Sequence, residues 1–341
     1  MAGLNEYTSP QAFWAYSQVM GKIKWNHSND KSVRACPRKA FYSGFFACPQ
    51  SRDGSPRREV YLLKHAIDVP LWRGNTVHLV IQEQILPAIK AGRQPDFNAA
   101  RAWAFDLVDR QALFSKTGRY RMQTKVSAGL DFCVLRSDFS GQGTMKSEIE
   151  EVKAGVSLAL HNLEKSFSDL LDRASQARGI EIEKEIHYGL DDQIHLDVKI
   201  DCLFFEHNNC VVIIDWKAEE GLNGNARDQL QVYAYAVIRC QYWQNVNCEN
   251  IELIEANLTT GERSLYAFTN DDFDDVDDRV FVGSQMLKPL FEQSAQIRDP
   301  EDFASASSPG TCQWCVVKEI CNGSLLSKIP TANPTLPFEF V

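Results

Sequence analysis

The stretch that decides the fold is KIDCLFFEHNNCVVIIDWKAEE, residues 199–220. The residues leading into it alternate in strand fashion, and after a turn the run VVII is continuously apolar, which suits a buried central strand. Residues i and i+2 of a strand point to the same face. Asp215 and Lys217 therefore project together, while Trp216 points the other way into packing.

A second acid, Asp201, lies one hairpin earlier. An antiparallel neighbour can bring it beside Asp215, and two close carboxylates repel unless a cation sits between them. Mg²⁺ and Mn²⁺ prefer oxygen ligands and keep several waters. A water polarised by such an ion and steered by a lysine suits phosphodiester hydrolysis. A single D-x-K at a strand end is more often a surface salt bridge, so the prediction of a metal site depends on the second acid.

Two flanking helices add polar residues. ARDQLQVYAYAVIRC, residues 226–240, reads as a helix in which Gln229 and Tyr233 lie one turn apart and share a face. Upstream, RGNTVHLVIQEQILPAI has apolar residues at helical spacing and carries His78. By itself, a histidine in such a helix is more often structural than a ligand.

Three of the ten cysteines form a tight cluster, Cys312, Cys315 and Cys321, in a C-x₂-C-x₅-C pattern. A tetrahedral metal site or a cubane cluster normally needs four ligands. The chain shows no secretion signal, so its cysteines are expected to be thiols. Far upstream, Cys36 precedes Pro37, and proline favours the first helical position, so Cys36 is expected at a helix N-terminus.

The ordered set of motifs resembles the core of PD-(D/E)XK nucleases in their RecB-like branch. The resemblance implies that Asp201 is the first acid, and that Asp215 and Lys217 are the second acid and the lysine. Gln229 and Tyr233 match the Gln-x₃-Tyr motif of that branch, and His78 matches its metal-binding histidine. The implied metal ligands are His78, Asp201 and Asp215. The second acid here is Asp, where Glu is commoner.

The resemblance extends to a sub-branch that binds an iron–sulfur cluster, which includes AddB-type helicase-nucleases and the nucleases of CRISPR spacer acquisition. It implies a [4Fe–4S] cluster held by one cysteine before the nuclease motifs and three after them. The matching residues here are Cys36, Cys312, Cys315 and Cys321. A four-cysteine zinc site would use the same ligands. Such a site would staple the two ends of the chain together, as a long-range cross-link does.

The expected fold is an α/β restriction-endonuclease-like core, a mixed central sheet flanked by helices. We expect two additions to this core. One is a large helical insertion, and the other is a clamp, formed by the N- and C-terminal segments, that binds the cluster. The expected division is 1–97 for the N-terminal segment with Cys36 and His78, 98–178 for the helical insertion, 179–290 for the nuclease core and 291–341 for the cysteine segment.

Composition agrees with a globular protein: 341 residues, 44% hydrophobic and 24% charged. No apolar run reaches the roughly 18 residues of a membrane span, so we expect a cytoplasmic protein without a membrane partner. The net charge of −9 argues against coating of nucleic acid. Between Lys31 and Arg73, however, nine basic residues stand against three acidic ones. This excess is either a solvated surface or a contact with a phosphate backbone.

The expected function is that of a Mg²⁺- or Mn²⁺-dependent deoxyribonuclease, an exonuclease or an endonuclease, that acts on single strands or DNA ends. The chain has no GxxxxGK[ST] motif and thus no P-loop helicase of its own. The chain is therefore expected to be a stand-alone nuclease or a subunit of a multi-protein system for DNA processing or antiphage defence. A helicase or another subunit of a defence complex is a possible partner, and the defence role is what the resemblance implies. The alternatives are a non-catalytic DNA-binding or scaffold subunit that keeps the nuclease fold, and a nuclease that acts on RNA.

Overall fold

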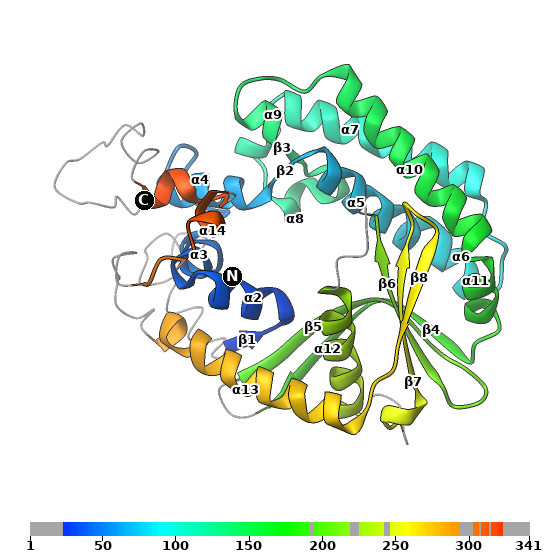
Figure 1. The fold of residues 1–341 in the computed structure, drawn as a ribbon. Coiled ribbons are helices and arrows are strands. Elements are labelled where there is room, and N and C mark those ends of the chain that lie inside the picture. The colour runs from blue at the N-terminus through cyan, green and yellow to red at the C-terminus, as the bar shows by residue number, and fades with distance from the viewer. Residues whose placement is uncertain are drawn as a thin grey trace, which may run out of the picture.

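The structure is a computed structural model that describes residues 23–190, 194–218, 225–241, 246–292, 303–306, 308–313 and 315–322. At its centre lies a six-stranded sheet flanked by helices (Figure 1). The strands are β1 (Ile23–Trp25), β4 (Gly179–Gly189), β5 (Ile194–Phe205), β6 (Val211–Lys217), β7 (Ile251–Asn257) and β8 (Glu262–Tyr266). Their order is β1-β5-β6-β7-β8, and β4 pairs with β5.

The sheet is mixed, as predicted. Strand β5 is antiparallel to β4 and β6, β6 is parallel to β7, and β7 is antiparallel to β8. Strand β4 pairs along nearly all of β5, so the parallel strand β1 and strand β6 share the other edge of β5. Strand β6 lies between β5 and β7 and is buried up to its last residue, Lys217. This is the predicted restriction-endonuclease-like arrangement, with the D-x-K strand at its centre.

Two apolar cores cover opposite faces of the sheet. The first contains Leu196, Val198 and Ile200, the predicted single face of β5, together with residues of α12 (Asn225–Arg239) and α13 (Asn270–Glu292). The second contains Trp216 and residues of α5 (Val69–Val80), α7 (Phe97–Lys116) and α10 (Lys146–Ser166). Trp216 therefore packs on the face opposite to Asp215 and Lys217, as the alternation of β6 predicts.

Helix α5 carries His78 and begins where Asp68 accepts a hydrogen bond from the Leu71 amide at 3.2 Å. It continues through a wide turn at Ile81–Ile85 into α6 (Leu86–Lys90). Helix α10 packs against α5 at Gly155, where a β-carbon would lie 2.1 Å from Cδ of Arg73. A side chain at position 155 would thus require the Arg73 side chain to move.

Residues 98–178 are largely helical, as predicted. Besides α7 and α10 they form α8 (Lys125–Ala128), α9 (Arg136–Phe139) and α11 (Ser168–Ser175). A short strand, β3 (Val134–Leu135), pairs in parallel with β2 (Ala66–Ile67), which lies outside this block. The helical block is therefore joined to the N-terminal segment by backbone hydrogen bonds as well as by side-chain packing.

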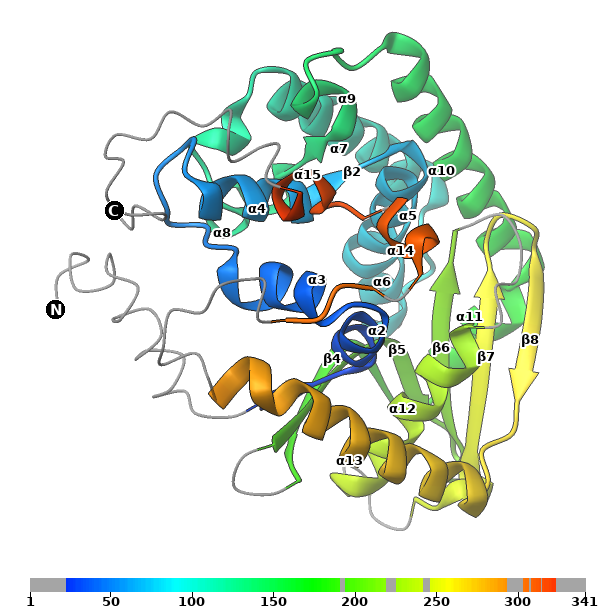
Figure 2. The same cartoon turned by 60° about the vertical axis from the view of Figure 1, so that its left-hand side comes forward.

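The two ends of the described chain meet. Helix α15 (Lys318–Cys321), which follows α14 (Pro309–Gln313), lies beside α4 (Pro56–His65) in both views (Figures 1 and 2). Arg38 of α3 (Pro37–Phe41) reaches Cys321 at the end of α15. Helix α2 (His27–Ala35) leads into α3. The Arg38 amide donates to the Ala304 carbonyl at 3.2 Å, and the Phe41 ring stacks on Phe303 at 4.6 Å. None of the described helices is long and apolar enough to cross a membrane.

Much of the basic excess between Lys31 and Arg73 serves structural contacts. Four of its side chains donate to backbone carbonyls, namely Arg38, Arg57, Arg58 and Lys64. Arg58 is only 2% exposed. Charged donors form strong hydrogen bonds to carbonyls that helix ends and turns leave unpaired. These four residues therefore hold loops in place, which the sequence count alone could not show.

Candidate active site

Three carboxylates lie in one row across adjacent strands. The β4–β5 register pairs Ile182 with Cys202 and Lys184 with Ile200, so Glu183 stands opposite Asp201. The β5–β6 register pairs Cys202 with Ile214, so the next step along both strands brings Asp215 opposite Asp201. Glu183, Asp201 and Asp215 thus lie side by side on β4, β5 and β6.

At this row the regular alternation of side chains along β5 is interrupted. Ile200 and Cys202, two residues apart on β5, pack in opposite cores. Glu183 has a left-handed backbone with φ of 50°, which a residue with a side chain rarely adopts. Such a conformation costs about 1–3 kcal/mol and is concentrated at functional sites. The local distortion aims the Glu183 carboxylate at Asp201 and His78.

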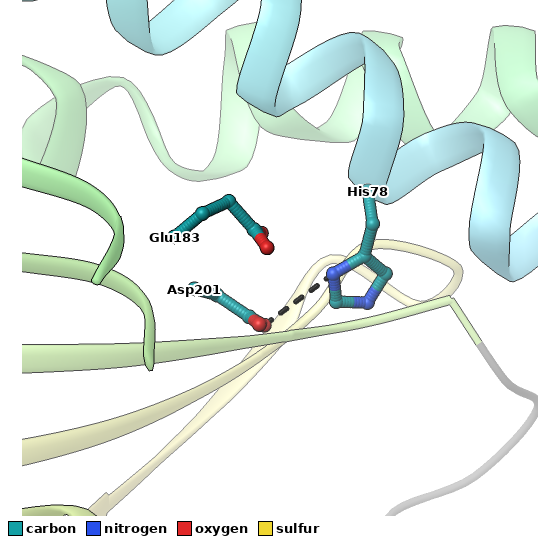
Figure 3. A group of neighbouring side chains, drawn as sticks. All are labelled: His78, Glu183 and Asp201. Carbon is teal, nitrogen blue, oxygen red and sulfur yellow. Dashed lines mark ion pairs between the residues drawn. The ribbon is translucent and has the colours of Figure 1, made fainter. Parts of the chain in front are cut away.

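His78 completes a compact group with these acids. Its Nδ1 atom lies 3.4 Å from Oδ2 of Asp201, and one ligand atom each from His78, Glu183 and Asp201 lies within 4.8 Å of the other two. Figure 3 shows the imidazole of His78 descending from its helix toward the two carboxylates on the strands. Burial lowers the pKa of His78, which favours the neutral imidazole that binds metal ions.

The second acid and the lysine form a chain of contacts that runs to α12. Nζ of Lys217 lies 2.6 Å from Oδ2 of Asp215 and donates to Oε1 of Gln229 at 3.3 Å. The Gln229 amide donates to the Tyr233 hydroxyl. The Asp215 side chain is 2% exposed and that of Lys217 is 27% exposed. The ammonium is therefore held from two sides and still reaches solvent.

Burial and mutual repulsion make both aspartates hold protons more tightly than usual. Burial raises the pKa of Asp201 to about 7, and the nearby charge of Glu183 adds to the rise. Burial also raises the pKa of Asp215 to about 6, with Asp201 as the next cause. The Trp216 amide opposes this at Asp201, because it donates to Oδ2 at 3.2 Å. Crowded carboxylates of this kind favour a cation between them.

The donor set fits a divalent ion. Carboxylate oxygens and a neutral imidazole are ligands for Mg²⁺ and Mn²⁺. The compact group contains the predicted ligands His78 and Asp201 and adds Glu183. Asp215 stands next in the row, outside that group, and pairs with Lys217. The sequence signal for Glu183 was its place on the strand before Asp201, but Glu181 and Glu185 on the same strand looked equivalent.

The four cysteines of the predicted cluster lie in one region, and all are free thiols. Cys36 caps α3 as predicted: its Sγ accepts a hydrogen bond from the Lys39 amide at 3.3 Å. Burial raises the pKa of the Cys315 thiol, and Cys36 and Cys321 add to the rise. Arg38, two residues after Cys36, reaches Sγ of Cys321 at 3.9 Å. The fold therefore brings the first cysteine to the last ones.

Comparison with known proteins agrees with the fold. The family model of the PD-(D/E)XK nuclease superfamily matches residues 24–322, which is most of the chain. The chain therefore belongs to the PD-(D/E)XK nuclease superfamily, whose members are nucleases that use divalent metals. A solved structure described as "Crystal structure of SSO0001" is similar at 15% identity over 64% of this chain and 85% of that chain, with a TM-score of 0.27. No curated protein matches the chain.

Proposed function

We propose that this protein is a divalent-metal-dependent deoxyribonuclease of the RecB-like branch. The observation that carries the proposal is the convergence of two groups at the end of β6. One is the compact group of His78, Glu183 and Asp201, and the other is the ion pair of Asp215 with Lys217. A non-catalytic scaffold has no need of a strained backbone or of crowded buried acids, since both cost stability.

Each side chain has a role in this proposal. His78, Asp201 and Asp215 hold the ion, and Glu183 joins them. The bound ion supplies positive charge against the charge that develops on the phosphoryl group. Lys217 orients the attacking water, and Asp215 and Gln229 hold its ammonium in position. Tyr233 fixes Gln229 through its hydroxyl. Burial raises the pKa of Tyr233, so that hydroxyl stays protonated.

The proposed substrate is DNA, as single strands or free ends, in DNA processing or antiphage defence. A helicase or another subunit of a defence complex would supply the open strand. The proposed division of the chain keeps the sequence boundaries. Residues 1–97 and 291–341 form the clamp, 98–178 the helical insertion, and 179–290 the nuclease core. Of the last segment, the structure describes residues 291–292, 303–306, 308–313 and 315–322, and the last two of these parts contain the three cysteines.

The clamp is proposed to carry a [4Fe–4S] cluster bound by Cys36, Cys312, Cys315 and Cys321. Support comes from the contacts of Arg38 and Phe41 with the chain just before α14, which hold Cys36 near the tail. A shared cluster would fix the N-terminal helices against the C-terminal ones, because a cross-link over a long loop restricts the unfolded chain. The zinc alternative uses the same four thiols.

Cleavage of labelled DNA in the presence of Mg²⁺ or Mn²⁺ tests the enzyme proposal. Single-stranded DNA should be cut, and Lys217→Ala and Asp201→Asn should each lower the rate by about 100-fold or more. Lys146→Ala, an exposed lysine at the start of α10, is the matched control and should cut normally. Binding of DNA without cleavage by the wild type would favour the scaffold alternative. Preferred cleavage of an RNA strand of the same sequence would favour the RNA nuclease.

A further inference from the structure

A polar hollow of about 550 Å³ adjoins the candidate active site. Gln229 and Tyr233, the two α12 residues of the Lys217 chain, both line it. Its other walls are formed by β1 and the start of α2, which include Lys24 and Ser28, and by strands β4 and β5. We call this hollow the α2 groove.

The α2 groove carries both signs of charge, with Lys24 and Lys199 against Glu185 and Asp197. Asp197 lies between Nζ of Lys24, at 3.7 Å, and the imidazole of His187. The other ring nitrogen of His187 lies 3.6 Å from Glu185. A bare phosphate in this groove would meet two carboxylates as well as the cations. The groove is therefore poorly suited to the sugar–phosphate backbone alone.

The groove instead offers donors and acceptors side by side. The Asn26 and Asn29 side chains, the Ser28 hydroxyl and the His27 imidazole all line it. Oδ1 of Asn26 already accepts from the Asn29 backbone amide, and Nδ2 of Asn29 donates to the Lys24 carbonyl, so each asparagine offers only its other polar atom. Nδ1 of His27 is buried and has no hydrogen-bond partner among the residues that the structure describes. Mixed donors and acceptors match the edge of an unpaired base, which presents both kinds of group. The volume falls within the range of about 300–1,000 Å³ typical of small-ligand sites.

The groove is also placed next to the chemistry. Lys199 lines it and pairs with Glu183 of the compact group. Gln229 lines it and holds Lys217. A base in the groove would therefore lie next to the residues proposed for the chemistry.

From this placement we propose that the α2 groove binds one unpaired base that flanks the cleaved phosphodiester. The groove selects single-stranded substrate, because the edge of a paired base is taken by its partner. This inference rests on the proposed nuclease function and adds the subsite that recognises its substrate.

Abasic substrates test the proposal, because an abasic site keeps sugar and phosphate and removes only the base. Single-stranded DNA with an abasic site on one side of the cleaved bond should show kcat/KM lower by roughly tenfold than intact DNA. In His187→Ala and Lys24→Ala that penalty should nearly vanish, while intact DNA is cut more slowly. Both side chains are more than half exposed, at 55% and 68%, so their removal should leave the fold intact.

His207→Ala is the matched control, since His207 is an exposed histidine on the β5–β6 turn and lies outside the groove. It should keep the full abasic penalty. An equal penalty in the wild type and both groove variants, or no penalty on either side of the bond in the wild type, would overturn the proposal.

A binding experiment separates this inference from the nuclease proposal. Fluorescence anisotropy with wild-type protein in EDTA reports binding without hydrolysis. Intact single strands should bind more tightly than strands with an abasic site at every third position, and the difference should shrink in His187→Ala. If no metal supports cleavage but this difference is present, the groove binds a base and the enzyme proposal is wrong. If cleavage occurs but the difference is absent, the groove proposal falls.

Discussion

Glu183 on β4 stands opposite Asp201 on β5, and ligand atoms of the two carboxylates lie within 4.8 Å of each other and of His78. Glu183 reaches this position through a left-handed backbone, with φ of 50°. Two acids from the consecutive strands β4 and β5 are thereby brought together with an imidazole from α5, a helix far upstream in the sequence.

Replacement of Glu183 should weaken the metal site without loss of the fold. Glu183→Gln removes a charge from the compact group, and we expect Mn²⁺ affinity to fall by about 10- to 100-fold. Isothermal titration calorimetry measures it. Glu181→Gln, the same change two residues earlier on β4 at a residue that pairs with Lys90, is the control. Equal Mn²⁺ affinity of wild type and Glu183→Gln would exclude Glu183 as a ligand.

Gln229 should act through Lys217. Gln229→Ala removes the acceptor that holds Nζ of Lys217 at 3.3 Å, and the turnover rate should fall by about 10- to 100-fold. Tyr233→Phe should have a smaller effect in the same direction, because it removes only the support of Gln229. Gln231 on the same helix donates to Asp272 instead, so Gln231→Ala should leave turnover unchanged. The rate of cleavage at saturating DNA reports all three.

The cysteine staple should be visible in the colour and the stability of the protein. Anaerobically purified wild type should be brown and contain iron, and Cys36→Ser and Cys312→Ser should each lose both properties. Loss of the cross-link should lower the free energy of unfolding by about 3–5 kcal/mol, by analogy with a disulfide. Cys210→Ser, a thiol beside the β5–β6 turn, is the control. A colourless protein with stoichiometric zinc would contradict the iron–sulfur assignment.

Arg58 should be a main support of the joint between the N-terminal segment and the helical block. Its guanidinium donates to the carbonyls of Pro49, Tyr120 and Gln123 at 2.6, 2.5 and 2.8 Å. Arg58→Met leaves these carbonyls without their charged donor and should cost about 3–5 kcal/mol in urea unfolding. Arg52→Met at an exposed neighbouring site should cost little. A loss below about 1 kcal/mol would show that water replaces the guanidinium.

His65 should make stability depend on pH. Burial lowers its pKa from 6.5 to about 4, with the charge of Lys64 as the next cause. Between these two values the unfolded chain binds a proton that the folded chain does not, so the free energy of unfolding falls as pH drops through this window. His65→Phe should keep the ring packing on Tyr61 and Phe132 but remove this dependence. Parallel urea curves of both proteins from neutral pH to about pH 4 test it.

The sequence determined those parts of the site that local periodicity controls. Asp215 and Lys217 share a face because they are two residues apart on a strand, and Gln229 and Tyr233 because they are four apart on a helix. The hairpin between β5 and β6 brought Asp201 beside Asp215, because the turn that joins them is short. Cys36 at a helix N-terminus followed from the proline after it. The buried D-x-K strand followed from its apolar run, whereas the mixed sheet was what the resemblance to PD-(D/E)XK nucleases implied.

Only the tertiary structure decided which of the other charged residues matter. Strand β4 carries Glu181, Glu183 and Glu185, and a regular alternation would treat them alike. The pairing register with β5 and the left-handed backbone at Glu183 single out one of them. Likewise, Arg58 is one of nine basic residues in its segment, and its burial depends on loops that are more than 60 residues away. Contacts of this kind depend on how distant elements pack, and no local spacing in the sequence encodes them.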